Sequence, residues 1–167
     1  MKFAITNTTI VMPDHLIPGG TILIEDDRII DFGRKVSTEG AECIDANGAY
    51  TGPGLIDIHT HADGVVNFHE NPEAAAKTLL DHGVTGVLPT LYFNVDAKEL
   101  IRQANVIRQD VKDGKADNII GFYMEGPYLN PNYGCNRENN PWKGPVDAAN
   151  YKEIVDAAGD LAKVWCL

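Results

Sequence analysis

Strand-like and helix-like segments alternate from Gly54 to the end of the chain, and this alternation constrains the fold most strongly. The patterns predict strands at 55–61, 84–91, 119–125 and from Ala162 onward, and helices at 72–82, 96–113 and 147–158. Strands that alternate with helices pair in parallel, because each helix carries the chain back along the sheet. The segment at 84–91 is almost continuously apolar, which is typical of a parallel strand that is covered on both faces.

The first 53 residues have a different pattern. Short strand-like segments at 3–11, 21–25, 28–32 and 42–45 are separated by turn signals such as Pro18-Gly19-Gly20 and Asn47-Gly48. We therefore predict two domains, a small sheet module over residues 1–53 and a parallel α/β domain over residues 54–167. A closed (β/α)₈ barrel takes roughly 250 residues, so four strands would make only its first half, and we expect the chain to be a truncated fragment. Its last strand would then lie at an open edge and promote association.

The composition excludes several classes of function. Fourteen Lys and Arg against 24 Asp and Glu give a net charge of −10, so we expect neither nucleic acid nor a membrane as a partner. The three scattered cysteines include no C-x-x-C pair, which indicates neither a disulfide framework nor a zinc knuckle. The sequence shows no secretory leader and no long apolar run, and we expect a cytoplasmic protein.

Candidate metal ligands lie at the ends of two predicted strands. His59 and His61 are two positions apart on a strand, so their side chains point to the same face. Glu125 ends the third predicted strand of the barrel domain, and the active sites of such barrels lie at the carboxyl ends of the strands. Two imidazoles and one carboxylate that meet there suit a divalent metal ion.

Each of these residues also has an ordinary interpretation. A single strand-end histidine or glutamate is more often solvated or hydrogen-bonded than metal-bound, and only the three together favour a metal site. Asp57 lies on the same strand face as His59 and either orients a histidine or makes a plain core hydrogen bond. The histidines in loops or at a helix end are interpreted as surface or capping residues: His15, His69 and His82.

Two sets of motifs resemble known proteins. Asp45-Ala46-x-Gly48 followed by Gly52-Pro53-Gly54-Leu55-Ile56-Asp57-x-His59-x-His61 resembles the start of an amidohydrolase-superfamily barrel. Gly83-Val84-Thr85, Leu88-Pro89-Thr90 and Met124-Glu125-Gly126-Pro127-Tyr128-Leu129-Asn130-Pro131 resemble the N-acetylglucosamine-6-phosphate deacetylase family. The resemblance covers essentially the whole chain.

The resemblance implies an α/β fold, the first half of a (β/α)₈ barrel preceded by the N-terminal part of a β-sandwich over residues 1–53. It implies that Glu125 is a direct metal ligand and that His59 and His61 hold a second metal in members with two ions. The cofactor would be one or two divalent ions, zinc first, with iron or manganese as alternatives. The implied reaction is deacetylation of N-acetylglucosamine 6-phosphate to glucosamine 6-phosphate and acetate.

The same resemblance places further metal histidines and a catalytic aspartate on later barrel strands, beyond Leu167. We therefore expect the isolated chain to be inactive, and the full-length protein to be a homodimer that binds a phosphorylated amino sugar.

The loop after Glu125 departs from the family pattern. Where the family has Lys-Gly-Ala-His, this chain has Tyr133-Gly134-Cys135-Asn136. Asn136 and Cys135 are the candidate substrate-binding residues; an asparagine can hydrogen-bond a sugar but cannot become cationic at neutral pH. The exact substrate therefore stays open.

Two alternative functions also stay open. One is a cyclic amidase of the dihydroorotase or hydantoinase type, which shares the His-x-His start but commonly uses a carboxylated lysine at the end of strand four. In this chain Lys163 lies at the beginning of that strand instead. The other is a non-catalytic metal-binding fragment, because no general base is identifiable.

Overall fold

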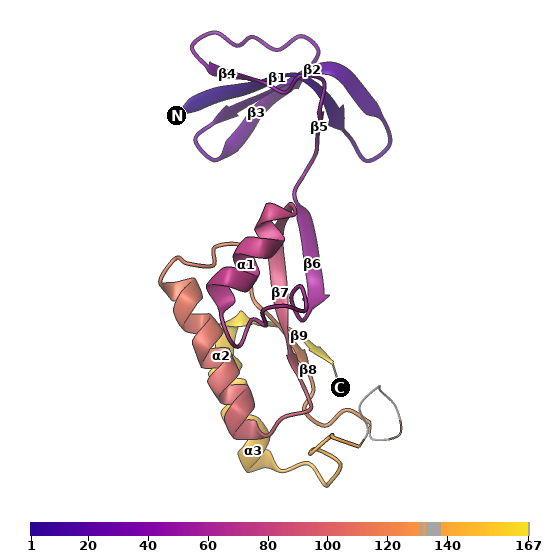
Figure 1. Cartoon of the computed structure of the whole chain (residues 1–167), viewed down its shortest axis with the longest axis vertical. Helices are drawn as coiled ribbons and strands as arrows, with labels where there is room; N and C mark the ends of the chain where they lie inside the picture. Colours follow the sequence, from indigo (N-terminus) through magenta and orange to yellow (C-terminus); the bar gives the residue numbers. More distant parts are fainter. Residues whose placement is uncertain (131, 133–137, 167) are drawn as a thin grey trace. The chain divides into compact units, whose positions relative to one another are not determined.

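The computed structural model describes residues 1–130, 132 and 138–166. The chain divides into two compact units, Met1–Pro53 and Gly54–Leu167, which are described separately (Figure 1). Within the described residues, every helix is too short or too polar to cross a membrane.

The N-terminal unit is a five-stranded sheet. Its strands are β1 (Lys2–Val11), β2 (Leu16–Glu25), β3 (Arg28–Gly33), β4 (Glu42–Asp45) and β5 (Tyr50–Thr51). The order is β3-β2-β1-β4, and β5 also pairs with β1. The first three strands are antiparallel, whereas β4 and β5 run parallel to β1.

Two predictions for this unit were wrong in detail. The turn signal Pro18-Gly19-Gly20 lies inside β2 rather than before it, because Gly20 pairs with Thr8 and the register shifts on both sides of that pair. Such a bulge accommodates residues that usually mark turns. The two-residue strand β5 was not predicted, since it is too short to have a recognisable pattern.

The second unit is a parallel α/β layer structure. Its elements are β6 (Leu55–Thr60), α1 (Pro72–Asp81), β7 (Val84–Tyr92), α2 (Ala97–Lys112), β8 (Phe122–Glu125), α3 (Ala148–Ala158), the 3₁₀ turn η1 (Gly159–Leu161) and β9 (Ala162–Cys166). The strands are all parallel, in the consecutive order β6-β7-β8-β9. Consecutive order is the strand order of a (β/α)₈ barrel, and four strands are half of one. The predicted fold class is confirmed.

The helices begin at residues that the sequence makes suitable as caps. Asn71 accepts a hydrogen bond from the Ala74 amide at 3.0 Å and precedes Pro72, which suits the first helical position. Asp96 and Asp147 cap α2 and α3 in the same way, with oxygen-to-nitrogen distances of 2.9 Å. The predicted bounds of these helices differ from the observed ones only at the cap residues.

The third predicted barrel strand is shorter than expected. The pattern predicts 119–125, but β8 begins at Phe122, and Ile119 makes only an isolated bridge to Val87. Gly121 explains the break: its φ is +156°, and an added Cβ would lie 2.6 Å from the Leu161 carbonyl oxygen. An apolar pattern alone carries no signal for this close approach of two backbones.

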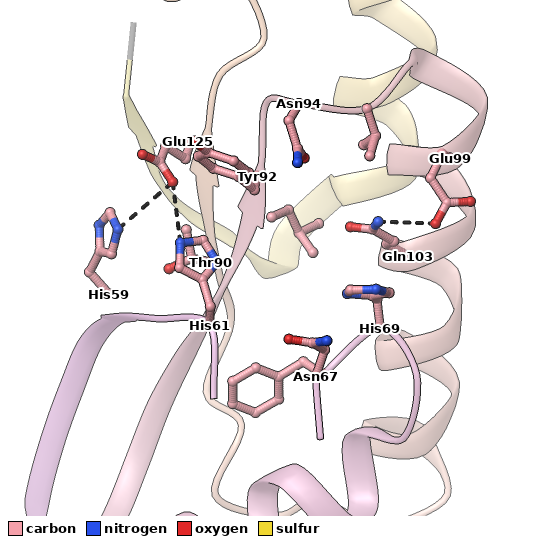
Figure 2. Close-up of a pocket in the computed structure, with 13 residues that line it drawn as sticks. His59, His61, Asn67, His69, Thr90, Tyr92, Asn94, Glu99, Gln103 and Glu125 are labelled. Atoms are coloured by element: carbon pink, nitrogen blue, oxygen red, sulfur yellow. Dashed lines mark hydrogen bonds and ion pairs between the residues drawn. The ribbon is translucent and has the colours of Figure 1, made fainter. Parts of the chain in front are cut away.

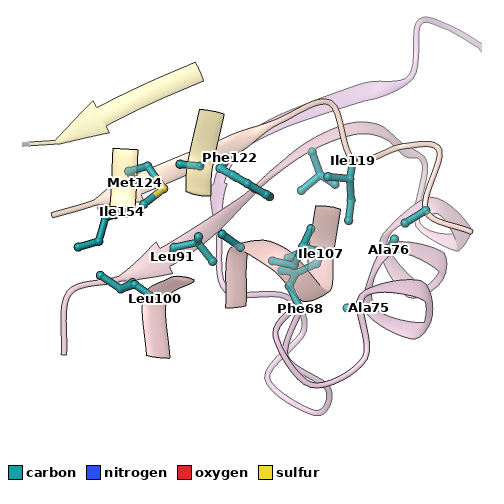
Figure 3. Close-up of a cluster of buried hydrophobic side chains, with 14 of the residues drawn as sticks. Phe68, Ala75, Ala76, Leu91, Leu100, Ile107, Ile119, Phe122, Met124 and Ile154 are labelled. Atoms are coloured by element: carbon teal, nitrogen blue, oxygen red, sulfur yellow. The ribbon is translucent and has the colours of Figure 1, made fainter. Parts of the chain in front are cut away.

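The hydrophobic core of the second unit lies between the sheet and its helices (Figure 3). Fully buried side chains from the strands and from α2 and α3 fill it: Leu91, Phe122, Met124, Leu100, Ile107 and Ile154. Side chains alternate between the two faces of a strand. The residues between these core positions, such as Thr90 and Tyr92 on β7 and Tyr123 and Glu125 on β8, therefore point to the opposite face, where the candidate site lies.

Candidate metal centre

His59, His61 and Glu125 meet at the carboxyl ends of β6 and β8 (Figure 2). His59 lies in β6, His61 follows its last residue, and Glu125 ends β8. The Glu125 Oε2 atom is 3.5 Å from His61 Nε2 and 3.9 Å from His59 Nε2. One ligand atom from each residue lies within 4.8 Å of the other two. The structure thus brings together the three residues that the sequence suggested as ligands.

The spacing and burial of these atoms fit a divalent ion. Ligand atoms about 2.1 Å from a tetrahedral ion lie roughly 3.4 Å apart, close to the two distances here. The Glu125 side chain is 17% exposed, and its Oε2 is buried without a hydrogen-bond partner among the described residues. A buried carboxylate oxygen without a donor is costly, and a cation between it and the imidazoles would remove that cost.

Local hydrogen bonds fix the backbone around the histidines. Asp57 Oδ1 accepts a bond from the His59 backbone amide at 3.0 Å, so this carboxylate contacts the main chain of His59 and not its ring. Thr60 Oγ1 accepts a bond from the Ala62 amide at 3.2 Å, and Ala62 has a φ of +81°. The chain therefore turns directly after His61.

Two tyrosines contact the imidazoles. The ring of Tyr92, at the end of β7, lies edge-on to His61 with centroids 5.3 Å apart. The ring of Tyr123, in β8, lies 4.3 Å from that of His59. Burial raises the pKa of Tyr123, and the neighbouring Cys166 side chain raises it further. The sequence analysis missed both residues, because an aromatic residue in a strand is usually part of the core.

Gly126 determines how the chain leaves β8 after Glu125. Its φ is +95°, and a Cβ at this position would lie 2.8 Å from the Phe93 Cβ. A side chain is therefore excluded by both conformation and space. The Gly126-Pro127 peptide bond that follows is cis.

A cavity of about 700 Å³ adjoins the three candidate ligands. Its remaining lining is partly apolar and partly made of neutral amides, with an imidazole and a carboxylate: Asn67, Phe68, His69, Thr90, Leu91, Tyr92, Asn94, Val95, Glu99 and Gln103. Arg102 donates two hydrogen bonds to Glu99 and lowers the pKa of that carboxyl to about 2. His69 was predicted to be a surface residue, but it lines this cavity. The position of His69 in a loop does not indicate from the sequence that its side chain lines a cavity.

The other described residues considered from the sequence have partners other than the three candidate ligands. His82 caps α1 and contacts the Thr78 carbonyl at 2.8 Å, and His15 is exposed beside Asp14. Lys163 Nζ donates to the Asp160 carbonyl at 2.8 Å. The candidate substrate residues Asn136 and Cys135 lie outside the described residues.

Sequence comparison finds relatives that are named dihydroorotase and D-hydantoinase. No protein-family model matches the chain. A dihydroorotase of Syntrophotalea carbinolica is 40% identical over 89 residues, which are 52% of this chain and 21% of that protein. A D-hydantoinase of Geobacillus stearothermophilus is 46% identical over 63 residues, 38% of this chain and 13% of that protein. The chain thus spans about a fifth or less of the length of these curated relatives.

Structural comparison finds deacetylases instead. An N-acetyl-D-glucosamine-6-phosphate deacetylase from Mycobacterium smegmatis superposes with a TM-score of 0.76 at 24% identity, over 98% of this chain and 46% of that one. The corresponding enzyme from Pasteurella multocida gives 0.77 at 22% identity, over 99% of this chain and 44% of that one. The two comparisons thus find enzymes with different names, dihydroorotase and hydantoinase by sequence and deacetylase by structure. The fold of this chain is that of the N-terminal part of the N-acetylglucosamine-6-phosphate deacetylases, as its motifs predicted.

Proposed function

We propose that this chain is the N-terminal part of a metal-dependent amide hydrolase and that His59, His61 and Glu125 hold its metal ion. The observation that carries this proposal is the convergence of the three ligand atoms around the buried Glu125 Oε2. The fold supports it, because the three residues lie at the carboxyl ends of parallel strands, where barrel enzymes have their active sites.

The donor set suits hydrolysis rather than a purely structural role. Among the described residues three ligands meet, the number that catalytic zinc sites use together with an open position for water or substrate, whereas structural zinc sites are closed by four. A divalent ion bound there would polarise an amide carbonyl and lower the pKa of water, which is the chemistry that amide hydrolysis needs. The chain's own residues hold the ligands in place and line the adjoining cavity. By resemblance, the general base is an aspartate of the eighth barrel strand, outside this sequence.

The leading substrate is N-acetylglucosamine 6-phosphate, with acetate and glucosamine 6-phosphate as products. Support comes from the deacetylase fold and from the Glu125-Gly126-Pro127 motif at the end of the third barrel strand. Asn136 and Cys135 are the proposed substrate contacts in the loop that follows. Zinc is the proposed ion, and a homodimer in the cytoplasm is the proposed form of the full-length protein.

A cyclic amide is the second candidate substrate, because the curated sequence relatives are dihydroorotases and hydantoinases. The Glu125-Gly126-Pro127 motif supports the deacetylase instead. Dihydroorotases and hydantoinases commonly bridge two metals with a carboxylated lysine at the end of strand four. Here Lys163 is the second residue of β9, and its ammonium group contacts the Asp160 carbonyl.

The two candidates are separated by assaying the full-length protein with both substrates. We expect Zn²⁺-dependent acetate release from N-acetylglucosamine 6-phosphate and no ring opening of dihydroorotate or hydantoin. Glu125→Gln should lower turnover at least about 100-fold, while the surface variant His82→Ala should not change it.

Other outcomes decide between the alternatives. Ring opening without acetate release would establish the cyclic amidase, and metal binding without turnover of either substrate would support a non-catalytic metal-binding protein. The 167-residue chain alone should be inactive; acetate release from it that His59→Ala abolishes would contradict the proposed location of the general base.

A further inference from the structure

β7 lies between the two strands that supply the candidate ligands, but it supplies none itself. Its contribution to the site is Tyr92, which pairs in register with Glu125 and whose ring meets His61. On the other side, Tyr123 lies two residues before Glu125 on the same strand face and meets the ring of His59. Each imidazole therefore contacts one tyrosine ring, and the two tyrosines come from different strands, Tyr92 from β7 and Tyr123 from β8. Figure 2 shows the side chains of Tyr92, His59 and His61.

Metal-binding histidines usually need an orienting partner. In most sites the second ring nitrogen donates to a carboxylate or a carbonyl, which fixes the ring. In the part of the chain that the structure describes, the only polar partner found for either imidazole is Glu125. Asp57, the carboxylate that the sequence suggested for this task, contacts the backbone of His59 instead. The side chains of His59 and His61 are 43% and 49% exposed, so without a neighbour their rings would rotate freely.

We infer that Tyr92 and Tyr123 are positioning residues, whose rings hold His61 and His59 in the orientation that binds the metal. Tilted and edge-on contacts between aromatic rings are attractive, and the two centroid distances of 5.3 and 4.3 Å lie at or close to the favourable range. This inference rests on the proposed metal site but adds residues to it that are not ligands.

The backbone of Tyr123 is fixed between two neighbouring strands, because Tyr123 pairs in register with Thr90 on β7 and with Val164 on β9. The inference assigns the orienting function to the tyrosine rings and not to their hydroxyl groups, and this distinction can be tested.

The effect of each tyrosine on metal binding is measured with the 167-residue chain, prepared free of metal. Zn²⁺ affinity is obtained by competition with a chromophoric chelator, and the geometry of the site is followed by the visible absorption of the Co²⁺-loaded protein. Tyr123→Leu and Tyr92→Leu should each weaken Zn²⁺ binding about tenfold and alter the Co²⁺ spectrum, as loss of an orienting neighbour does. Tyr123→Phe and Tyr92→Phe keep the ring and should bind within about twofold of the wild type. Tyr151→Leu is the matched control, because Tyr151 lies exposed on α3.

The results separate the inference from the proposed function. A wild-type chain that binds neither ion would overturn the metal site itself. A wild-type chain that binds, with Leu variants that bind equally well, would overturn the positioning role; so would Phe variants that lose as much affinity as the Leu variants.

A second measurement does not depend on whether the Leu variants fold. In the metal-free wild type, the ring protons of His59 should show NMR shifts caused by the Tyr123 ring, and Tyr123→Val, a strand-favouring change, should remove them. Ring-proton shifts of His59 at random-coil values in the folded wild type would contradict the inference.

Discussion

Gly126 shows at the scale of one residue how the site depends on its backbone. It follows Glu125 directly, has a φ of +95°, and leaves no room for a Cβ beside Phe93. Gly64, in the loop after β6, has a similar φ of +81° but open space around it. Substitutions at Gly126 and Gly64 can therefore be compared to distinguish the cost of backbone strain from the cost of a steric clash.

We predict that Gly126→Ala lowers the free energy of unfolding by about 2–3 kcal/mol and Gly64→Ala by about 1 kcal/mol. Both variants carry the cost of a left-handed φ, and only the first also displaces Phe93. Urea unfolding of both variants gives the values. Equal losses would show that the close approach to Phe93 does not constrain position 126.

The residues of the candidate site differ in how well the sequence predicts them. His59, His61 and Glu125 could be predicted to converge, because side-chain alternation and the common edge of parallel strands are fixed by the fold. Tyr92, Tyr123 and the cavity residue His69 could not, since a strand-end aromatic or a loop histidine has the same sequence appearance whether or not it touches the site.

α2 shows at the scale of one element how local electrostatics support the cavity wall. Glu99, in its first turn, accepts two hydrogen bonds from Arg102 and one from the buried Gln103. Arg102 is the main reason that the pKa of Glu99 is lowered from 4.5 to about 2. A carboxyl whose pKa is lowered on folding stabilises the folded state above its unfolded value, and that stabilisation disappears as the pH falls through its folded value.

Glu99→Gln should therefore lower the free energy of unfolding by less than about 1 kcal/mol at pH 7, a small effect because solvent screens a partly exposed pair. The difference between wild type and variant should shrink as the pH falls from 4.5 towards about 2. Urea unfolding at several pH values measures it, and Arg102→Gln should show the same trend. A difference that stays constant with pH would contradict this account of Glu99.

Element boundaries were predictable where a specific residue marks them. Asn71, Asp96 and Asp147 begin helices because their side chains accept amide hydrogen bonds that the first helical turn leaves free. The start of β8 and the length of β2 were not predictable. Gly121 and Gly20 matter there because other segments of the chain approach them closely, and the residues next to them in the sequence do not show this.

At the scale of the whole molecule, the unit Gly54–Leu167 contains four consecutive parallel strands, and the chain superposes on less than half of each deacetylase. β6 is an edge strand of this sheet, and several of its apolar side chains are exposed: Leu55, Ile56 and Ile58. The strand order could be predicted from the alternation of strands and helices, whereas the substrate could not, because the comparisons divide between dihydroorotases and deacetylases.

The central claim is that one divalent ion is held by two histidines from the first barrel strand and a glutamate from the third. Calorimetric titration of the metal-free chain with Zn²⁺ tests it most directly. We predict binding of at least one ion per chain, weakened more than about 100-fold in His59→Ala, His61→Ala and Glu125→Ala and unchanged in His82→Ala. Wild-type affinity in the three ligand variants, or no binding by the wild type, would contradict the claim.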